Sequence, residues 1–257
     1  MPDDRSPGQV GLPGGRVKQQ QFTIESNAAI AHQVYELRLS GDAGALATPG
    51  QFVNVQVGNA YLRRPLSVAK WDDRGMTLIY KVVGSGTDWL AQQPTGARLD
   101  ILTGLGTGFD LKKARKHPLL VGGGVGLPPL YQLGIELIKM GCQPRLIMGF
   151  ASERDVFYQK EFEQLMPVTL MTQDGSAGGK GLVTDASLQA QDSFLYACGP
   201  IPMLKALHAL PLDGQFSLEE RMGCGFGACM GCTIQTAKGP RRVCHEGPVF
   251  SKEDLLW

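Results

Sequence analysis

The sequence has no continuous run of 18 apolar residues, and this absence argues against a transmembrane helix. It also lacks an excess of charge. Its 25 Lys and Arg residues against 24 Asp and Glu give a net charge of +1, too small a field to attract nucleic acid. Residues 1–15 are polar and lack the apolar centre of a secretory signal. We therefore expect a cytoplasmic protein with no membrane or nucleic-acid partner.

Cysteine is scarce, but four of the six cysteines lie close together near the C-terminal end. In a reducing compartment, such clusters bind metal more often than they form disulfides. The spacing C-x4-C-x2-C-x11-C begins as in plant-type ferredoxins, which hold a 2Fe–2S cluster. A structural zinc site is the alternative, although zinc usually takes two C-x2-C pairs. The predicted cluster ligands are Cys224, Cys229, Cys232 and Cys244.

The N-terminal half contains short β-type runs separated by turn residues, a pattern typical of a small antiparallel barrel. These runs cover residues 21–26, 34–39, 52–57, 76–83 and 98–102. From residue 117 strands and helices alternate, which predicts a parallel sheet with helices on its faces. The expected helices cover residues 127–139, 158–165 and 203–210.

These patterns divide the chain into four expected parts. Residues 1–20 form a flexible tail, residues 21–113 a barrel, residues 114–213 an α/β nucleotide-binding domain, and residues 214–257 the cysteine domain. About 40 residues make a core too small for stability, so the last part is expected to need its metal.

Two loops of the predicted α/β domain suit a dinucleotide. Gly122, Gly123 and Gly124 follow an apolar run and precede a helix, where backbone N–H groups can bind phosphate. They do not match the G-x-G-x-x-G register, and a tight strand–helix turn is the simpler alternative. The sequence Cys198-Gly199-Pro200 ends another strand. Loops at the carboxyl ends of parallel strands face one crevice, and we predict NAD there.

Further motifs resemble a known family. Arg64-Pro65-Leu66-Ser67 resembles the flavin-binding motif of the ferredoxin–NADP reductase superfamily, although Leu66 stands where an aromatic residue is usual. Residues 122–126 and 198–200 resemble its nucleotide motifs. Residues 20–257 as a whole are similar to the electron-transfer subunits of NAD-dependent dihydroorotate dehydrogenases, above all at residues 220–222 and 244–250.

The resemblance implies FAD in the barrel, with Arg64 neutralising the pyrophosphate and Ser67 bonding the isoalloxazine ring. Further FAD contacts are implied at Ile79, Tyr80, Lys81, Gly86 and Thr87. Cys198 is expected near the nicotinamide. Hydride exchange between NADH and a flavin requires stacking and orientation, so no catalytic acid or base is expected.

The resemblance also implies a function in pyrimidine biosynthesis. The chain would carry electrons from the FMN of a separate catalytic subunit, through the 2Fe–2S cluster and FAD, to NAD⁺, in a heterotetramer with two copies of each chain. One alternative is a related NAD(P)H reductase subunit serving a ferredoxin-dependent, sulfite-reducing or transhydrogenase complex. The other is a zinc-stabilised nucleotide-binding module without enzymatic activity.

Two further expectations concern specificity and assembly. Glu153 follows a predicted strand and favours the free ribose hydroxyls of NAD, while the neighbouring Arg154 opposes this. Apolar residues near the end of the chain are expected to exceed what a small domain can bury, and so to bind the partner; the alternative is that they pack back on the protein. They are Phe226, Met230, Val249, Phe250, Leu255, Leu256 and Trp257.

Overall fold

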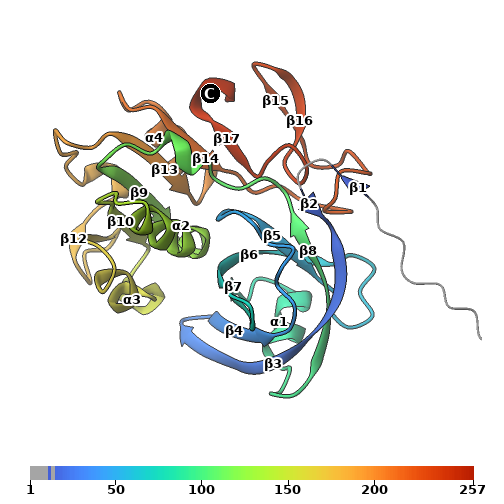
Figure 1. Cartoon of the computed structure of the whole chain (residues 1–257). Helices are drawn as coiled ribbons and strands as arrows, with labels where there is room; N and C mark the ends of the chain where they lie inside the picture. The colour runs from blue at the N-terminus through green and yellow to red at the C-terminus, as the bar shows by residue number, and fades with distance from the viewer. Residues whose placement is uncertain (1–10, 13–14) are drawn as a thin grey trace, which may run out of the picture.

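The computed structural model describes residues 11–12 and 15–257 and shows a barrel beside an α/β sheet (Figure 1). Six antiparallel strands close the barrel in the order β3-β4-β7-β6-β5-β8. Alternating side chains, such as Phe22 and Ile24, fill its interior, and Leu90 of α1 joins them. The elements are β3 (Lys18–Ala31), β4 (Val34–Ser40), β5 (Phe52–Val55), β6 (Arg64–Trp71), β7 (Gly75–Lys81), α1 (Ser85–Ala91) and β8 (Arg98–Leu105). The expected barrel is confirmed.

Strand β6 is the one barrel strand that the hydrophobic pattern did not predict. It begins with Arg64 and Pro65, and proline inside a run argues against a strand because it has no N–H to donate. Its burial pattern shows no regular alternation either. In the structure Pro65 lies opposite Asn54 of β5. The flavin-type motif therefore occupies the first half of a barrel strand.

The second layer is a seven-stranded sheet with the order β12-β11-β10-β9-β13-β14-β17, parallel except for β17. Its central strands β9 and β13 are buried along their whole length, as expected for strands covered on both faces. The strands are β9 (Pro118–Gly123), β10 (Arg145–Phe150), β11 (Val168–Thr172), β12 (Gly179–Lys180), β13 (Phe194–Cys198), β14 (Gly214–Ser217) and β17 (Val249–Ser251).

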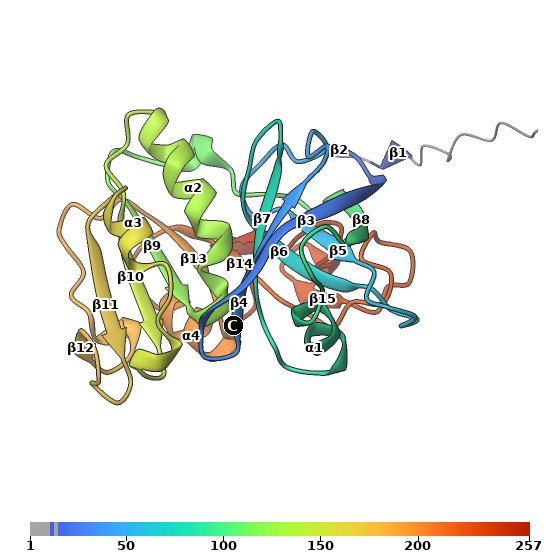
Figure 2. The same ribbon diagram turned by 90° about the horizontal axis from the view of Figure 1, so that it is seen from below.

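Helices and short 3₁₀ turns connect these strands. Helix α2 (Pro128–Lys139) lies between the sheet and the barrel and packs on β6 (Figure 2). The other helices are α3 (Gln159–Glu163) and α4 (Ile201–His208). The turns are η1 (Leu111–Lys113), η2 (Gly124–Gly126), η3 (Glu153–Asp155), η4 (Val183–Asp185) and η5 (Lys252–Asp254). None of the helices in the described residues is long and apolar enough to cross a membrane.

The cysteine segment is built into the same sheet. Strands β14 and β17 flank it in sequence and pair with each other. The boundary expected at residue 214 falls between β13 and β14, which are also hydrogen-bonded to each other. Between β14 and β17 lies the hairpin of β15 (Thr233–Thr236) and β16 (Gly239–Arg242). Cys232 and Cys244 share one core cluster with Phe216 and Leu195 of the sheet. The sheet therefore supports the cysteine segment from one side.

The first residues are described only in part. The short strands β1 (Gly11–Leu12) and β2 (Gly15–Arg16) pair with each other. Barrel strand β3 already begins at Lys18. Most of the tail expected over residues 1–20 lies outside the described residues.

Candidate functional site

A cavity of about 340 Å³ lies where the barrel meets the sheet. Pro65, Leu66 and Ser67 of β6 form one wall, and the two glycine-containing loops form the opposite wall. Those loops meet because β9 and β13 are paired, with Cys198 opposite Gly122. The structure thus gathers segments that are far apart in the sequence. The loop residues that line it are Gly123, Gly124, Val125, Gly126, Cys198, Gly199 and Pro200.

A second cavity, of about 470 Å³, adjoins the first and continues along the ends of the sheet strands. Gly123, Gly124 and Lys81 line both, so one elongated molecule could extend through the two. Asp155 and Gln173 line the second cavity, whereas Glu153 and Arg154 are exposed and do not. Among the residues that line the second cavity, the acidic one is Asp155, two residues after Glu153.

Arg64 is placed to receive an anion. Its Nη1 donates to the carbonyl of Leu62 at 2.7 Å, and no carboxylate in the described part of the chain pairs with it. The guanidinium lies against Gly86, where a Cβ would come within 2.5 Å of Nε. Thr87 closes the adjoining turn, because its Oγ1 accepts from the N–H of Val83 at 2.9 Å. A half-buried cation without a counter-ion fits a pyrophosphate.

Of the three residues expected at the end of β7, only Lys81 lines the cavities. Tyr80 is 2% exposed and its hydroxyl donates to Asn27 Oδ1 at 3.0 Å inside the barrel, where burial raises the pKa of the phenol. Ile79 is buried as well. Any ligand contact from these two residues must come from the main chain. Lys81 forms an ion pair at 3.7 Å with Asp155 across the crevice.

Cys198 lines the first cavity and is 9% exposed. Burial raises the pKa of its thiol to about 12, outweighing the hydrogen bond with Ser217 that lowers it. The side chain is therefore a neutral thiol near pH 7. It can shape a contact surface but is not an activated nucleophile.

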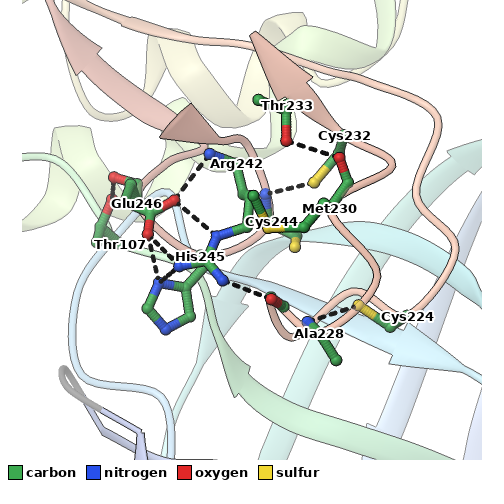
Figure 3. A network of polar contacts seen from close by, with 11 residues as sticks. Thr107, Cys224, Ala228, Met230, Cys232, Thr233, Arg242, Cys244, His245 and Glu246 are labelled. Atoms are coloured by element: carbon green, nitrogen blue, oxygen red, sulfur yellow. Dashed lines mark hydrogen bonds and ion pairs between the residues drawn. The ribbon is translucent and has the colours of Figure 1, made fainter. Parts of the chain in front are cut away.

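In the cysteine loop, residues 224–232, backbone N–H groups donate to the sulfur atoms of cysteines (Figure 3). Cys224 Sγ accepts from the backbone N–H groups of Ala228 at 3.2 Å and Cys229 at 3.4 Å. Burial acts to raise the pKa of Cys224, but these donors and that of Phe226 lower it to about 7. Cys232 Sγ accepts from the N–H of Cys244 at 3.4 Å. N–H donors aimed at thiolate sulfur suit the ligands of an iron–sulfur cluster.

The four cysteines come together as two pairs. Besides burial, the Cys229 side chain acts on the pKa of Cys224 and the Cys232 side chain acts on the pKa of Cys244, so the two members of each pair lie near each other. Within residues 11–12 and 15–257, no three His, Cys, Asp or Glu side chains form a common metal-binding group. Two pairs of thiols match two iron atoms with two thiolates each.

An ionic network, which the sequence analysis did not identify, ties the loop to its surroundings (Figure 3). Arg242 donates to the carbonyl of Gly227 and to the Glu246 carboxylate. The hydrogen bond from Arg242 lowers the pKa of Glu246 to about 2. Thr107, just after β8, donates through Oγ1 to the carbonyl of Glu246 at 3.2 Å. In the sequence, an arginine and a glutamate two residues to either side of Cys244 form the pattern that could have predicted this network.

Other cavity residues were missed because they come from distant segments. Ser217, Glu219, Glu220, Met222 and Pro248 line the first cavity. Ser217 ends β14, the next three follow that strand, and Pro248 precedes β17. The pairing of these two strands brings them together at the crevice. Sequence alone had noted residues 220–222 and 248 as part of a resemblance, without a position.

The end of the chain packs back on the protein only in part. Leu256 is 62% exposed and Trp257 38% exposed, so partner contact by these two residues stays a prediction. Leu255 is 6% exposed, and the Trp257 ring lies 5.5 Å from His208 and 5.8 Å from Phe216. Val249 and Phe250 are also buried, because they form β17 of the large sheet. Phe226 and Met230, near the cluster cysteines, are exposed as well.

Comparison with known proteins agrees with this geometry. Residues 219–256 match the model of the iron–sulfur cluster binding domain of dihydroorotate dehydrogenase B, and residues 120–209 match the oxidoreductase NAD-binding domain. A structure of an NADH-dependent reduced ferredoxin–NADP oxidoreductase superposes with a TM-score of 0.84 at 28% identity, covering 98% of this chain and 92% of that one. A ferredoxin reductase of carbazole 1,9a-dioxygenase shares the fold, with a TM-score of 0.67 at 23% identity over 76% and 65% of the two chains.

Two curated relatives cover nearly the whole chain. The dihydroorotate dehydrogenase B (NAD⁺) electron transfer subunit of Shouchella clausii is 45% identical over 94% of this chain and 99% of its own. The subunit of the same name from Fusobacterium nucleatum is 42% identical over 93% and 99%. Identity of this extent, together with the iron–sulfur domain match, favours an iron–sulfur cluster over zinc. The chain therefore belongs to the family of electron transfer subunits of the NAD-dependent dihydroorotate dehydrogenases B.

Proposed function

We propose that this chain carries electrons from the FMN of a separate catalytic subunit, through a 2Fe–2S cluster and FAD, to NAD⁺ in pyrimidine biosynthesis. One observation carries the proposal. The cavity between the β6 motif and the nucleotide loops is also lined by Glu220 and Met222, which lead within a few residues to Cys224. A bound flavin exchanges electrons singly or in pairs, as a chain between a one-electron cluster and a two-electron nicotinamide requires.

The barrel side of the crevice suits FAD. Arg64 offers its unpaired guanidinium to the pyrophosphate, with Gly86 and Thr87 shaping the adjoining turn. Ser67 and the flanking Pro65 and Leu66 face the cavity, where the ring would lie. Lys81 lines the same space, and the main chain at Ile79 and Tyr80 completes the proposed contacts.

The sheet side suits NAD. Gly123 and Gly124 line both cavities and have no side chain to block a nucleotide. Gly122 lines neither, but its lack of a side chain lets Leu127 and Leu130 pack against the end of β9 and so supports the loop. Cys198, Gly199 and Pro200 form the neighbouring wall beside the proposed flavin. The neutral Cys198 thiol orients the nicotinamide without exchanging a proton with it. Orientation is the contribution that hydride transfer needs.

The cysteine loop suits the cluster. Cys224 and Cys229 would hold one iron, and Cys232 and Cys244 the other, as their pairing suggests. We extend the proposal to the division into a barrel (residues 21–113), a nucleotide domain (114–213) and a cluster domain (214–257). A heterotetramer with two catalytic subunits in a reducing cytoplasm completes it. All six cysteines are free, as such a compartment favours.

Reconstitution tests the proposal directly. The purified chain is expected to contain FAD, iron and inorganic sulfide, and NADH is expected to bleach its flavin absorbance. Mixed with the FMN-containing subunit, it should reduce NAD⁺ with dihydroorotate as donor and sediment as a complex of two copies of each chain. Zinc in place of iron, or a chain that reduces ferredoxin and leaves dihydroorotate turnover unchanged, would contradict it.

A further inference from the structure

Asn54 connects the barrel to the cysteine loop. It lies in β5 and is 1% exposed, and its Nδ2 donates to the carbonyl oxygen of Cys224 at 3.2 Å. On the barrel side, Asn54 is the direct partner of Pro65 in the β5–β6 pair. Phe52, two positions earlier on β5, lines the cavity beside the same motif. One buried side chain therefore links the two segments proposed to hold different cofactors.

The loop is shaped to accept this side chain. Gly225 follows Cys224 with φ of +79°, and a Cβ there would lie 2.4 Å from Asn54 Nδ2. A residue with a side chain would be strained and would push the amide away. The contact therefore depends on a residue from each side.

A buried asparagine is costly in a barrel wall, and this one is only partly satisfied. Its Oδ1 is buried and accepts no hydrogen bond within the described residues. Burying a polar atom without a partner destabilises a protein, and an apolar residue of the same size would avoid that cost. The hydrogen bond from the amide to the Cys224 carbonyl offsets that cost.

We propose that Asn54 is a positioning residue that fixes the first cluster ligand relative to the flavin-binding strand. Holding the Cys224 carbonyl orients the start of the loop whose N–H groups at Ala228 and Cys229 point at Cys224 Sγ. Hydrogen bonds to sulfur set the reduction potential of iron–sulfur clusters. Asn54 thereby tunes that potential and the path between the two centres. The inference rests on the proposed function.

The test compares Asn54→Leu with wild type in the full-length chain. Gln56→Met is the matched control, because Gln56 makes similar amide bonds to the carbonyls of Gly58 and Ala60 but does not contact the loop. In Asn54→Leu, amide hydrogen exchange over residues 224–229 is expected to accelerate about tenfold, the effect of losing one buried hydrogen bond. The cluster potential and its electron paramagnetic resonance spectrum are expected to shift, and the control to match wild type.

Hydrogen exchange and the spectrum separate this inference from the proposed function. A wild-type chain without an iron–sulfur signal would refute the proposed function, while the exchange data would still report on Asn54. Wild-type exchange and potential in Asn54→Leu would overturn the inference. If that variant does not fold, Gly225→Ala displaces the amide from the loop side; the same acceleration supports the inference, and its absence overturns it.

Discussion

At the level of single residues, Cys224 and Cys142 differ in what surrounds their sulfur atoms. Cys224 has backbone N–H donors that lower its pKa to about 7 against the effect of burial. Cys142 has burial alone, which raises its pKa. Of these two environments, only that of Cys224 stabilises the thiolate that binds a metal. Burial and the neighbouring Cys232 raise the pKa of Cys244, so a lowered pKa does not mark every proposed ligand.

Replacing Cys229 or Cys232 with serine is expected to remove iron and inorganic sulfide. The cysteine segment should lose stability with the metal, since metal binding contributes directly to folding. FAD should remain because the proposed site lies on the barrel. Iron, sulfide and flavin analysis measures this, and Cys142→Ser, outside the cluster, is expected to retain all three. Full iron content in both cluster variants would refute the ligand assignment.

The buried ion pair of Arg145 and Asp192 predicts how stability depends on pH. Burial acts to raise the pKa of Asp192, but the hydrogen bonds from Arg145 and from the Gln189 N–H outweigh it, and the pKa is lowered. Because the folded pKa lies below the unfolded value of about 3.9, the pair stabilises the protein above that pH. This contribution is lost as the pH falls through the folded pKa.

We expect Asp192→Asn to reduce the free energy of unfolding at pH 7 by about 3–5 kcal/mol, since it leaves a buried guanidinium unpaired. Denaturant unfolding at pH 7 and at pH 3 measures this, and the gap between variant and wild type should narrow at the lower pH. An equal gap at both values would show that the carboxylate charge contributes nothing.

At the scale of elements, the 3₁₀ turn η3 presents Asp155 to the second cavity and leaves Glu153 outside it. A carboxylate beside the ribose favours NADH and repels a 2′-phosphate. Wild type is therefore expected to prefer NADH to NADPH in kcat/KM. Asp155→Asn should reduce that preference about tenfold, the effect of one hydrogen bond to a charged group.

Glu153→Gln serves as the matched control for this turn. It removes a charge of the same sign two residues away, and its exposed position predicts an unchanged preference. If Glu153→Gln changes the preference and Asp155→Asn does not, then Glu153, as inferred from the sequence, is the residue that selects NADH over NADPH. Equal efficiency of wild type with both nucleotides would contradict the predicted preference itself.

The last residues form an element of the fold. Leu255 is buried, and Trp257 packs on His208 and Phe216. Deleting residues 255–257 is expected to destabilise the protein by about 2 kcal/mol for the buried leucine alone. Thermal unfolding measures this, and the truncated chain is expected to melt at a lower temperature. Unchanged melting with weaker binding to the catalytic subunit would support the expectation that Leu256 and Trp257 contact the partner.

At the scale of the whole molecule, the exposed apolar residues beside the cluster are the candidates for partner contact. Phe226 is 37% exposed and Met230 is 55% exposed, both within the cysteine loop. Changing Phe226 to serine is expected to cost about 2 kcal/mol of association free energy, roughly a 30-fold weaker Kd for the catalytic subunit. Titration calorimetry measures this, while NADH oxidation with a dye should persist.

Leu188→Ser is the control for that surface. Leu188 is 39% exposed but lies in the loop before β13, outside the cysteine segment. It is expected to leave the affinity unchanged. Equal loss of affinity in both variants would place the interface elsewhere.

Local patterns in the sequence were enough to predict the two main architectures and the nature of the candidate site. Alternating runs specify a barrel and strand–helix alternation specifies a parallel sheet, because both patterns are local and depend on which face is buried. The cysteine spacing is local as well, since four thiolates must reach one cluster from one loop and one turn. Strand β6 escaped this reasoning because Arg64 and Pro65 interrupt its pattern.

Contacts between residues far apart in the sequence could not be predicted from local patterns. Strands β14 and β17 pair across the cysteine segment, which buries Leu255 and brings Ser217 to the cavity. Asn54 reaches Cys224 across 170 residues, and no local pattern records that contact. Such contacts follow from how the barrel packs against the sheet, and packing depends on the shapes of all the elements together. The sequence indicates the chemistry of each part, and only the fold sets their relative positions.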